Sequence, residues 1–309
     1  IARINVQLVE TGGGSQLWGE RFDRPIAELF LLQDDIIRGI SRVLEPRLVR
    51  ETFERIEPRH CEYDAWQAYR RASGLVAIKG WRNDTFAEAA ELLRRSVAID
   101  PGFARAHALL SLVRGLGQRV GLVHDRQEAV AESLAAAERA LALDTSDSTV
   151  LGFAGCALAD VGHIDRGLAM LEQAVELDPS NAQAWAAIGA AHVLADRPRE
   201  AIEPLRRGIR ISPLDNRLAV WSSFLAIALL GTGDLDAALA ETDVACRRDL
   251  RNHMPRVVRA AVLVAAGRAD DAARALDEAR RLRPELDDKD VECLVGRQLL
   301  APMRQFGLV

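Results

Sequence analysis

Six histidines and three pairs of adjacent aspartates are the residues of this chain that could bind a metal or transfer protons. No two histidines lie three or four residues apart and no His-Glu-x-x-His motif occurs, so no helix presents a pair of zinc ligands on one face. The paired acids are neighbours in sequence, and neighbours on a helix point about 100° apart, so they do not converge on one ion or substrate. We therefore expect no metal site and no acid–base pair. The histidines are His60, His107, His124, His163, His192 and His253, and the pairs are Asp34–Asp35, Asp270–Asp271 and Asp287–Asp288.

Two glycine-rich stretches could in principle hold a phosphate or a dinucleotide. The stretch from Thr11 to Ser15 lacks the Gly-Lys-Ser/Thr ending that supplies the lysine and the magnesium ligand of a phosphate loop. Gly115, Gly117 and Gly121 are spaced one residue too widely for the dinucleotide fingerprint, and they follow a predicted helix where a strand would be needed. We expect a hairpin turn at the first stretch and a long loop between two helices at the second. With no Gly-x-Ser-x-Gly elbow either, we predict no cofactor, no catalytic residues and no enzymatic activity in this chain.

Charge and cysteine spacing narrow the possible environment and partners. The 309 residues carry a net charge of -5, which lacks the positive field that would hold the chain on nucleic acid. Four cysteines, Cys61, Cys156, Cys246 and Cys293, lie far apart, as expected for reduced thiols and not for a disulfide framework or a zinc site. No apolar run approaches the roughly 20 residues of a membrane span. We expect a cytoplasmic protein, and because the chain begins with isoleucine we expect it to be part of a longer polypeptide.

A repeat of 34 residues organises most of the chain. Leu171 recurs as Leu205, and Pro179 as Pro213, with small residues repeating at the same interval. Small residues at fixed positions allow two helices to pack closely, and a proline after the second helix directs the chain into the next unit. The small positions are Gly155, Gly189, Ala226 and Ala260 on the first helices and Gly167, Ala201, Ala238 and Ala272 on the second.

This order of small, small, large, small and proline positions resembles a tetratricopeptide repeat (TPR). The resemblance is strongest over residues 148–286 and implies an all-α fold, a right-handed α–α superhelix, because each helical hairpin must stack on the next to cover its apolar face. We predict about six units in residues 61–286. Residues 287–309 are predicted to form a capping helix and tail, with acidic residues at its start and an apolar face through Val291, Leu294 and Val295.

Residues 1–60 do not fit the repeat and form a small α/β remnant. Alternating apolar residues at Ile4, Val6 and Leu8 predict a strand, which pairs across the glycine turn with a second strand over residues 17–22. A helical period follows from Ile26. The sequence of residues 3–10, 17–24 and 29–36 resembles the end of a TolB-like module. That resemblance implies a bacterial signalling protein in which the module precedes a TPR array, with an adenylate or guanylate cyclase of class III as the first choice of parent. The alternatives are a winged-helix transcription regulator and a free-standing scaffold or assembly factor.

The concave side of such an array, lined by the first helix of each unit, is the predicted binding surface. Its projected residues are mainly apolar, which favours an amphipathic helix or apolar peptide from a partner protein or from the parent chain itself. The positions differ from the Lys, Asn and Arg with which TPR domains hold acidic chaperone tails, so we expect no such tail here. The alternative is that neighbouring helices fill the groove. The predicted groove residues are Thr149, Phe153, Cys156, Gln183, Ala187, Val193, Phe224, Ile227, Met254, Val257 and Val258.

Arginines cluster on the predicted second helices of the last three units. By the register of the repeat they face the convex side, where we expect a solvated surface interleaved with acidic residues; an acidic partner or an RNA surface is the alternative. The clusters are Arg197, Arg199, Arg206, Arg207 and Arg210, then Arg247, Arg248 and Arg251, then Arg280, Arg281 and Arg283.

Overall fold

The computed structural model describes residues 2–9, 16–24, 64–79, 82–123 and 125–305. Strand β1 (Ala2–Val9) pairs antiparallel with β2 (Gln16–Arg24), in a register that joins Ala2 to Arg24 and Leu8 to Trp18. The predicted two-stranded hairpin is therefore confirmed. Its glycine turn and the helix predicted from Ile26 lie outside the described residues.

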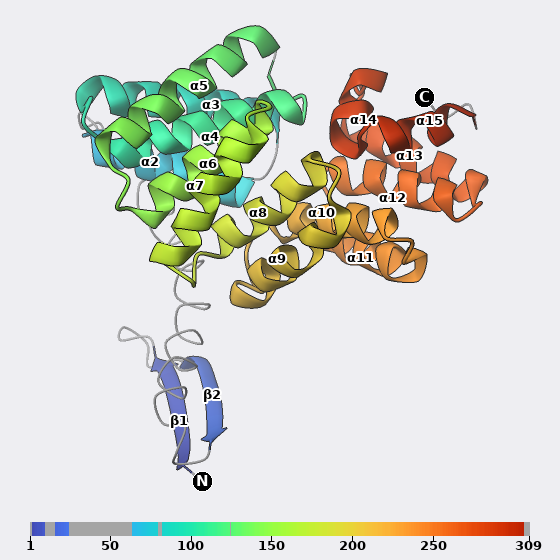
Figure 1. The fold of residues 1–309 in the computed structure, drawn as a ribbon, viewed down its shortest axis with the longest axis horizontal. Coiled ribbons are helices and arrows are strands. Elements are labelled where there is room, and N and C mark those ends of the chain that lie inside the picture. Colours follow the sequence, from blue (N-terminus) through green and yellow to red (C-terminus); the bar gives the residue numbers. More distant parts are fainter. Residues whose placement is uncertain (1, 10–15, 25–63, 80–81, 124, 306–309) are drawn as a thin grey trace.

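Stacked helices make up the rest of the described chain (Figure 1). Consecutive helices pair, as α4 with α5 and α6 with α7, and the first helices also stack on one another, α4 on α6, α6 on α8 and α8 on α10. This arrangement confirms the predicted all-α superhelical fold. The helices are α2 (Ala65–Gly74), continued by the π-helical turn η2 (Leu75–Lys79), α3 (Asn83–Ile99), α4 (Ala104–Arg119), α5 (Arg126–Leu143), α6 (Ser148–Asp160), α7 (Ile164–Leu177), α8 (Ala182–Leu194), α9 (Pro198–Ile211), α10 (Leu218–Gly231), α11 (Leu235–Arg248), α12 (Met254–Ala265), α13 (Ala269–Leu282), α14 (Asp288–Val295) and α15 (Arg297–Gln305).

Side-chain caps start several of the first helices. Asp147 accepts a hydrogen bond from the Thr149 amide at 2.7 Å, and Asn181 accepts one from the Ala184 amide at 2.9 Å. These bonds satisfy amides that have no partner within the helix. Between the helices of one unit the chain turns through a residue with positive φ, which is Gly162 after α6 and Asp196 at the equivalent place after α8.

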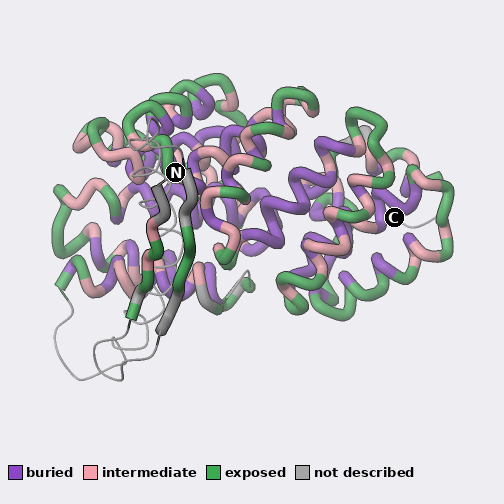
Figure 2. Tube along the Cα trace, turned by 90° about the horizontal axis from the view of Figure 1, so that it is seen from below, coloured by how far each residue is buried: buried purple, intermediate pink, exposed green. Residues whose placement is uncertain are grey.

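Small residues let the two helices of a unit approach as the repeat predicted. A Cβ atom added at Gly155 would lie 2.9 Å from the Gly167 carbonyl oxygen, and one added at Gly189 would lie 2.8 Å from the Ala201 carbonyl oxygen. Such distances are too short for a side chain, so only glycine permits this packing. Figure 2 shows buried residues along the whole array, with exposed ones on its outer turns.

Two boundaries differ from the prediction. Helix α4 continues through Gly117 to Arg119, so the expected long loop is reduced to residues 120–125. Gly117 packs closely against Phe86, whose Cδ1 would be 3.1 Å from an added Cβ. At the carboxyl end, the single predicted capping helix is divided into α14 and α15 at Gly296, whose φ of 82° is outside the helical range.

The carboxyl end of the array also contacts its second unit. The Asp290 carboxylate on α14 pairs with Arg283 at 2.7 Å and with Arg126 of α5 at 2.5 Å, and Arg283 donates to the Val120 carbonyl at 3.0 Å. Arg283 was predicted to lie in a solvated cluster, and this prediction is wrong, because the contact buries it. We call these residues, Val120, Arg126, Arg283 and Asp290, the cross-array contact.

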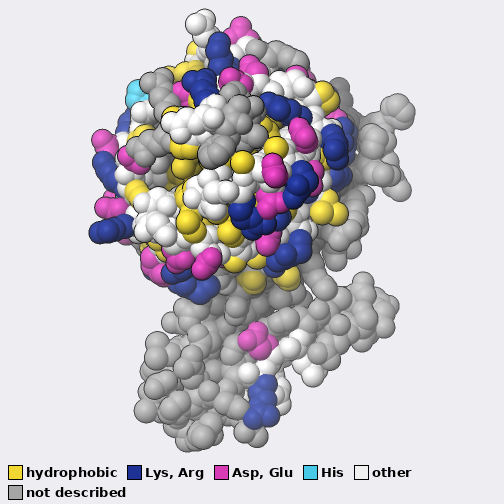
Figure 3. All heavy atoms as spheres, turned by 90° about the vertical axis from the view of Figure 1, so that its right-hand side faces the viewer, with side chains coloured by type: hydrophobic (Ala, Val, Ile, Leu, Met, Phe, Trp, Pro, Cys, Tyr) yellow, Lys and Arg dark blue, Asp and Glu magenta, His cyan; other side chains and the backbone are white. Residues whose placement is uncertain are grey.

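The surface at the end of the array that carries α14 and α15 mixes both signs of charge. Figure 3 shows basic and acidic side chains interspersed there, with scattered apolar ones. Several of the predicted surface arginines have acidic neighbours, as Arg210 has Glu203 at 2.5 Å and Arg197 has Asp165 at 3.6 Å. Among the helices that the structure describes, none is both long and apolar enough to cross a membrane.

Candidate functional site

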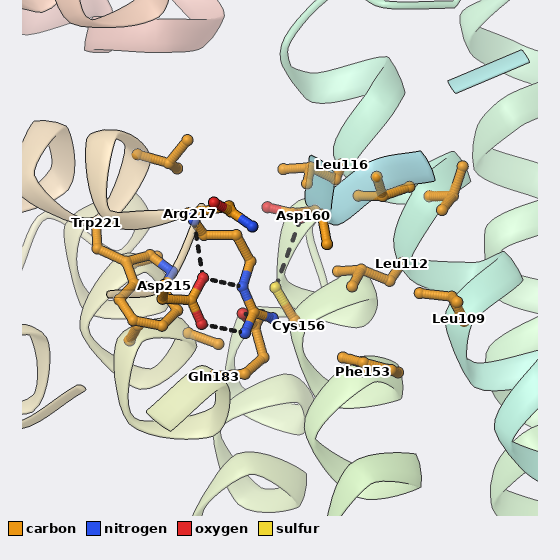
Figure 4. A pocket seen from close by; sticks show the side chains of 18 of the residues that line it. Leu109, Leu112, Leu116, Phe153, Cys156, Asp160, Gln183, Asp215, Arg217 and Trp221 are labelled. Carbon is orange, nitrogen blue, oxygen red and sulfur yellow. Dashed lines mark hydrogen bonds and ion pairs between the residues drawn. The ribbon is translucent and has the colours of Figure 1, made fainter. Parts of the chain in front are cut away.

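A hollow of about 170 Å³ lies between the first helices α4, α6, α8 and α10, with α2, η2 and α3 also contributing to its wall (Figure 4). Because the repeat stacks these helices side by side, residues that lie more than 100 positions apart in sequence meet across it. Apolar side chains form most of its wall: Leu109, Leu112 and Leu116 from α4 face Phe153 of α6 and Phe224 of α10. We call this space the hollow.

Polar side chains gather at one end of the hollow, and Arg119 with Asp160 forms the first group. Arg119 Nε donates to Asp160 Oδ1 at 2.5 Å, and the guanidinium carbon lies 4.9 Å from the centre of the Phe224 ring. Both residues are buried, at 6% and 8% exposure. Burial raises the pKa of Asp160 above its usual value, although Arg119 opposes the shift. The pair is thus held inside the array, at the ends of α4 and α6.

Arg217 is the centre of the second polar group. It donates to both Asp215 oxygens, at 2.8 and 2.6 Å, and to the Gln183 amide oxygen at 2.7 Å. Burial opposes ionisation of Asp215, but the Arg217 guanidinium holds the pKa of that carboxyl below its usual value. Arg217 also lies 5.1 Å from the Trp221 ring centre. Gln183 and Arg217 are 34 residues apart, so they occupy the same position in successive units.

Cys156 is the one thiol among the described residues that line the hollow. Its sulfur lies 3.8 Å from Asp160 Oδ2. Burial raises the pKa of the thiol well above its usual value, and the neighbouring carboxylate adds to the shift. Because only the thiolate is reactive, Cys156 stays an inert thiol at neutral pH. Within the described ranges, no three His, Cys, Asp or Glu residues are placed to hold a metal ion.

The structure brings only part of the predicted groove together. Phe153, Cys156, Gln183, Ala187 and Phe224 line the hollow. Val193 and Ile227, with Phe224 again, line a second pocket of about 360 Å³ that α14 helps to enclose. Thr149 is half-buried at the start of α6 and does not line either pocket.

Met254, Val257 and Val258 are placed differently from the prediction. All three are fully buried, because α12 is packed against α10, α11, α13, α14 and α15. In the last unit, neighbouring helices therefore fill the groove, which was the alternative. The open part of the concave side of the array therefore ends at α10.

Sequence reasoning missed the polar end of the hollow. Of these polar residues the projected groove included only Gln183, and it left out Arg119 and Asp160, at the ends of α4 and α6, and Asp215, in the turn before α10. One signal was available, since Asp215-x-Arg217 is a local turn in which the Asp215 carboxylate accepts the Arg217 amide at 2.8 Å. The interval of 34 residues then points from Arg217 to Gln183.

Comparison with known proteins agrees with the geometry. Residues 154–216 match the family described as tetratricopeptide repeat. The stacked helices have a TPR-like fold. The fold resembles a chain of the APC/C hetero-tetramer Cut9–Hcn1, with a TM-score of 0.57, 15% identity, and coverage of 82% of this chain and 46% of that one. A thermophilic TPR protein of Thermus thermophilus gives a TM-score of 0.50 and 19% identity, covering 60% of this chain and 96% of that one.

One curated bacterial protein is similar to this chain in sequence. A Rhizobium meliloti (strain 1021) protein, provisionally named adenylate cyclase 3, is 36% identical over 112 residues. The match covers 36% of this chain and 19% of that protein. The chain therefore spans only a small part of the relative's length.

Proposed function

We propose that this chain is a non-catalytic, protein-binding and regulatory TPR domain, and that the hollow is its binding site. The observation that carries the proposal is the placement of Phe153, Leu112, Leu116 and Phe224 around an open space on the first helices. Apolar side chains around an open concavity favour a peptide or helix that buries apolar side chains there. The thiol state of Cys156 speaks against nucleophilic catalysis at the same place.

We further propose that the parent is a bacterial signalling protein, with a class III adenylate or guanylate cyclase as the first choice. The sequence similarity to the Rhizobium meliloti protein supports this choice, and so does the resemblance of the first residues to a TolB-like module. The occupant of the hollow is then either a partner protein or another part of the parent chain. A winged-helix regulator or a free-standing scaffold would carry the same array with no cyclase activity.

Peptide selection tests the binding site. Random peptides displayed on phage would be selected on the whole chain, and the affinities of enriched peptides measured by calorimetry. The substitution Phe153→Glu places a charge in the hollow, and burying an unpaired charge is strongly unfavourable, so we expect at least about a tenfold loss of affinity. Leu177→Glu is the matched control, since Leu177 is an exposed leucine on the second helix α7. Equal affinities of the two variants, or no enriched peptide, would refute this site.

Regulation of a parent enzyme needs a separate measurement. The complete product of the gene that encodes this chain would be assayed for cyclic AMP and cyclic GMP synthesis, with and without residues 62–309. We expect synthesis that changes when the array is removed. Synthesis that is indifferent to the array, or none at all, would leave a protein-binding scaffold and contradict the regulatory proposal.

A further inference from the structure

Arg119 lines the hollow and keeps one hydrogen-bond donor without a partner among the described residues. Its Nε is paired with Asp160, but its Nη1 atom is buried and has no hydrogen-bond partner among the described residues. The residue is only 6% exposed, and it lines the hollow together with Phe224, over whose ring it lies. A buried guanidinium donor without an acceptor is unfavourable, so a ligand that supplies an oxygen there would be stabilised.

The charges around this donor decide what kind of oxygen fits. Arg119 has Asp160 as its counter-ion, and Arg217 has Asp215, so the polar end of the hollow is balanced without a ligand. A carboxylate entering the hollow would add a negative charge beside Asp160 and Asp215. The Gln183 oxygen is already bonded to Arg217. The site therefore lacks a hydrogen-bond acceptor, whereas its charges are already balanced. A carbonyl oxygen supplies this acceptor, and its burial does not require the desolvation of an ion.

The volume of the hollow limits the size of the ligand that can enter it. At about 170 Å³ the hollow is similar to engineered apolar cavities of roughly 150 Å³ that hold a benzene molecule. One aromatic or branched aliphatic side chain fits against Leu112, Leu116 and Phe153, and a bulky helix with several anchors does not.

We propose that the hollow takes a single apolar side chain of a peptide, and that an uncharged carbonyl oxygen of the same peptide accepts a hydrogen bond from Arg119 Nη1. This inference rests on the proposed function, because it specifies the ligand of the proposed site. It gives the site a preference for uncharged peptide segments and makes the binding largely insensitive to salt.

Three small probes separate the apolar contribution from the carbonyl contribution. N-acetyl-L-phenylalaninamide carries an aromatic side chain and uncharged carbonyls, N-acetyl-L-phenylalanine replaces the amide by a carboxylate, and toluene lacks the carbonyl. Binding would be followed on the whole chain through the NMR signal of the Trp221 indole, which lines the hollow. We expect the amide to bind about tenfold more tightly than the carboxylate and than toluene, in line with one hydrogen bond to a charged donor.

A double variant removes the donor while the hollow stays apolar. Arg119→Met with Asp160→Leu replaces the buried pair by residues of similar size, an exchange that often leaves stability unchanged. Its affinity for the amide should fall about tenfold and its affinity for toluene should not change. Arg114→Met with Glu132→Leu is the matched control, because this pair also joins a buried arginine of α4 to a carboxylate, at 2.5 Å, and Arg114 does not line the hollow.

The outcomes separate this inference from the proposed function. Equal binding of amide, carboxylate and toluene, or an amide affinity that the Arg119→Met/Asp160→Leu variant retains, would overturn the carbonyl contact. If selected peptides still lose affinity with Phe153→Glu, the proposed site survives that failure. If no probe changes the Trp221 signal and no peptide is selected, both the contact and the site are refuted.

Discussion

His253 makes the stability of the array depend on pH. It precedes α12, is 4% exposed, and its Nε2 atom has no hydrogen-bond partner among the described residues. Burial lowers the pKa of its imidazole from 6.5 to about 4, and the positive charge of Arg283 adds to the shift. Below pH 6.5 the unfolded chain therefore binds a proton at this residue that the folded chain does not bind. The free energy of unfolding must fall as the pH is lowered from about 6.5 towards 4.

The size of the effect follows from the shift. The difference of 6.5 - 4, or 2.5 pH units, corresponds to about 3 kcal/mol when both states have fully titrated. Between neutral pH and pH 5 only the interval from 6.5 to 5 contributes, which is about 2 kcal/mol. The contribution of neutral His253 to the free energy of unfolding is fully present above pH 6.5 and is lost progressively as the pH is lowered.

Paired denaturation curves isolate this residue. Urea unfolding of the wild-type chain and of a His253→Leu variant would be followed by circular dichroism at about pH 7, 6 and 5. Since both proteins contain every other titrating group, His107 and His192 included, their contributions cancel in the difference. We expect the stability of the wild type relative to the variant to decrease by about 2 kcal/mol from about pH 7 to pH 5. A difference that stays constant over this range would refute the buried, neutral state of His253.

Three further perturbations test the packing and the buried groups. Gly189→Ala should lower the free energy of unfolding by about 1–3 kcal/mol, because the new methyl group would meet Leu205 and the Ala201 carbonyl. Gly152→Ala, where the nearest atom is 3.4 Å away, should be neutral or gain up to about 1 kcal/mol in the same urea titration. Asp290→Ala removes the buried carboxylate that pairs with Arg283 and should lower the free energy of unfolding by about 3–5 kcal/mol, whereas Asp288→Ala, on the exposed side of α14, should change little. Hydrogen exchange should accelerate near residues 118–123 only in the Asp290→Ala variant, and equal exchange in both variants would contradict the cross-array contact. The half-buried Cys156 should react more slowly with iodoacetamide in the folded chain than after urea unfolding, as mass spectrometry would show, because the pKa of its thiol is raised; equally rapid labelling of the native chain would contradict that raised pKa.

The repeat made most of the fold predictable. Helix pairing depends on local spacing, and the interval between Gly155 and Gly189 or Leu171 and Leu205 records the same close contact in successive units. The hairpin was equally accessible, because alternation at Ile4, Val6 and Leu8 is a property of neighbouring residues. Helix pairing and the hairpin both follow from patterns among residues that lie close together in the sequence, and a single sequence shows such patterns.

The candidate site was less accessible because it depends on how far the array curves. The Arg119–Asp160 pair joins residues 41 positions apart, which differs from the repeat interval, and Arg126 meets Asp290 across 164 positions. A repeat specifies the contacts of one unit with the next, but not contacts across the superhelix. For the same reason the burial of Val257 and Val258 among the helices around α12 could not be predicted from their position in the repeat.

Cross-linking tests the central claim, that peptides bind in the hollow, most directly. A selected peptide with a photoreactive group at its apolar anchor would be irradiated with the whole chain, and the adducts would be located by mass spectrometry. The account predicts adducts on the residues of α4, α6, α8 and α10 that line the hollow, with Leu112 and Phe153 among them. Adducts confined to the second helices α7, α9 or α11 would contradict it.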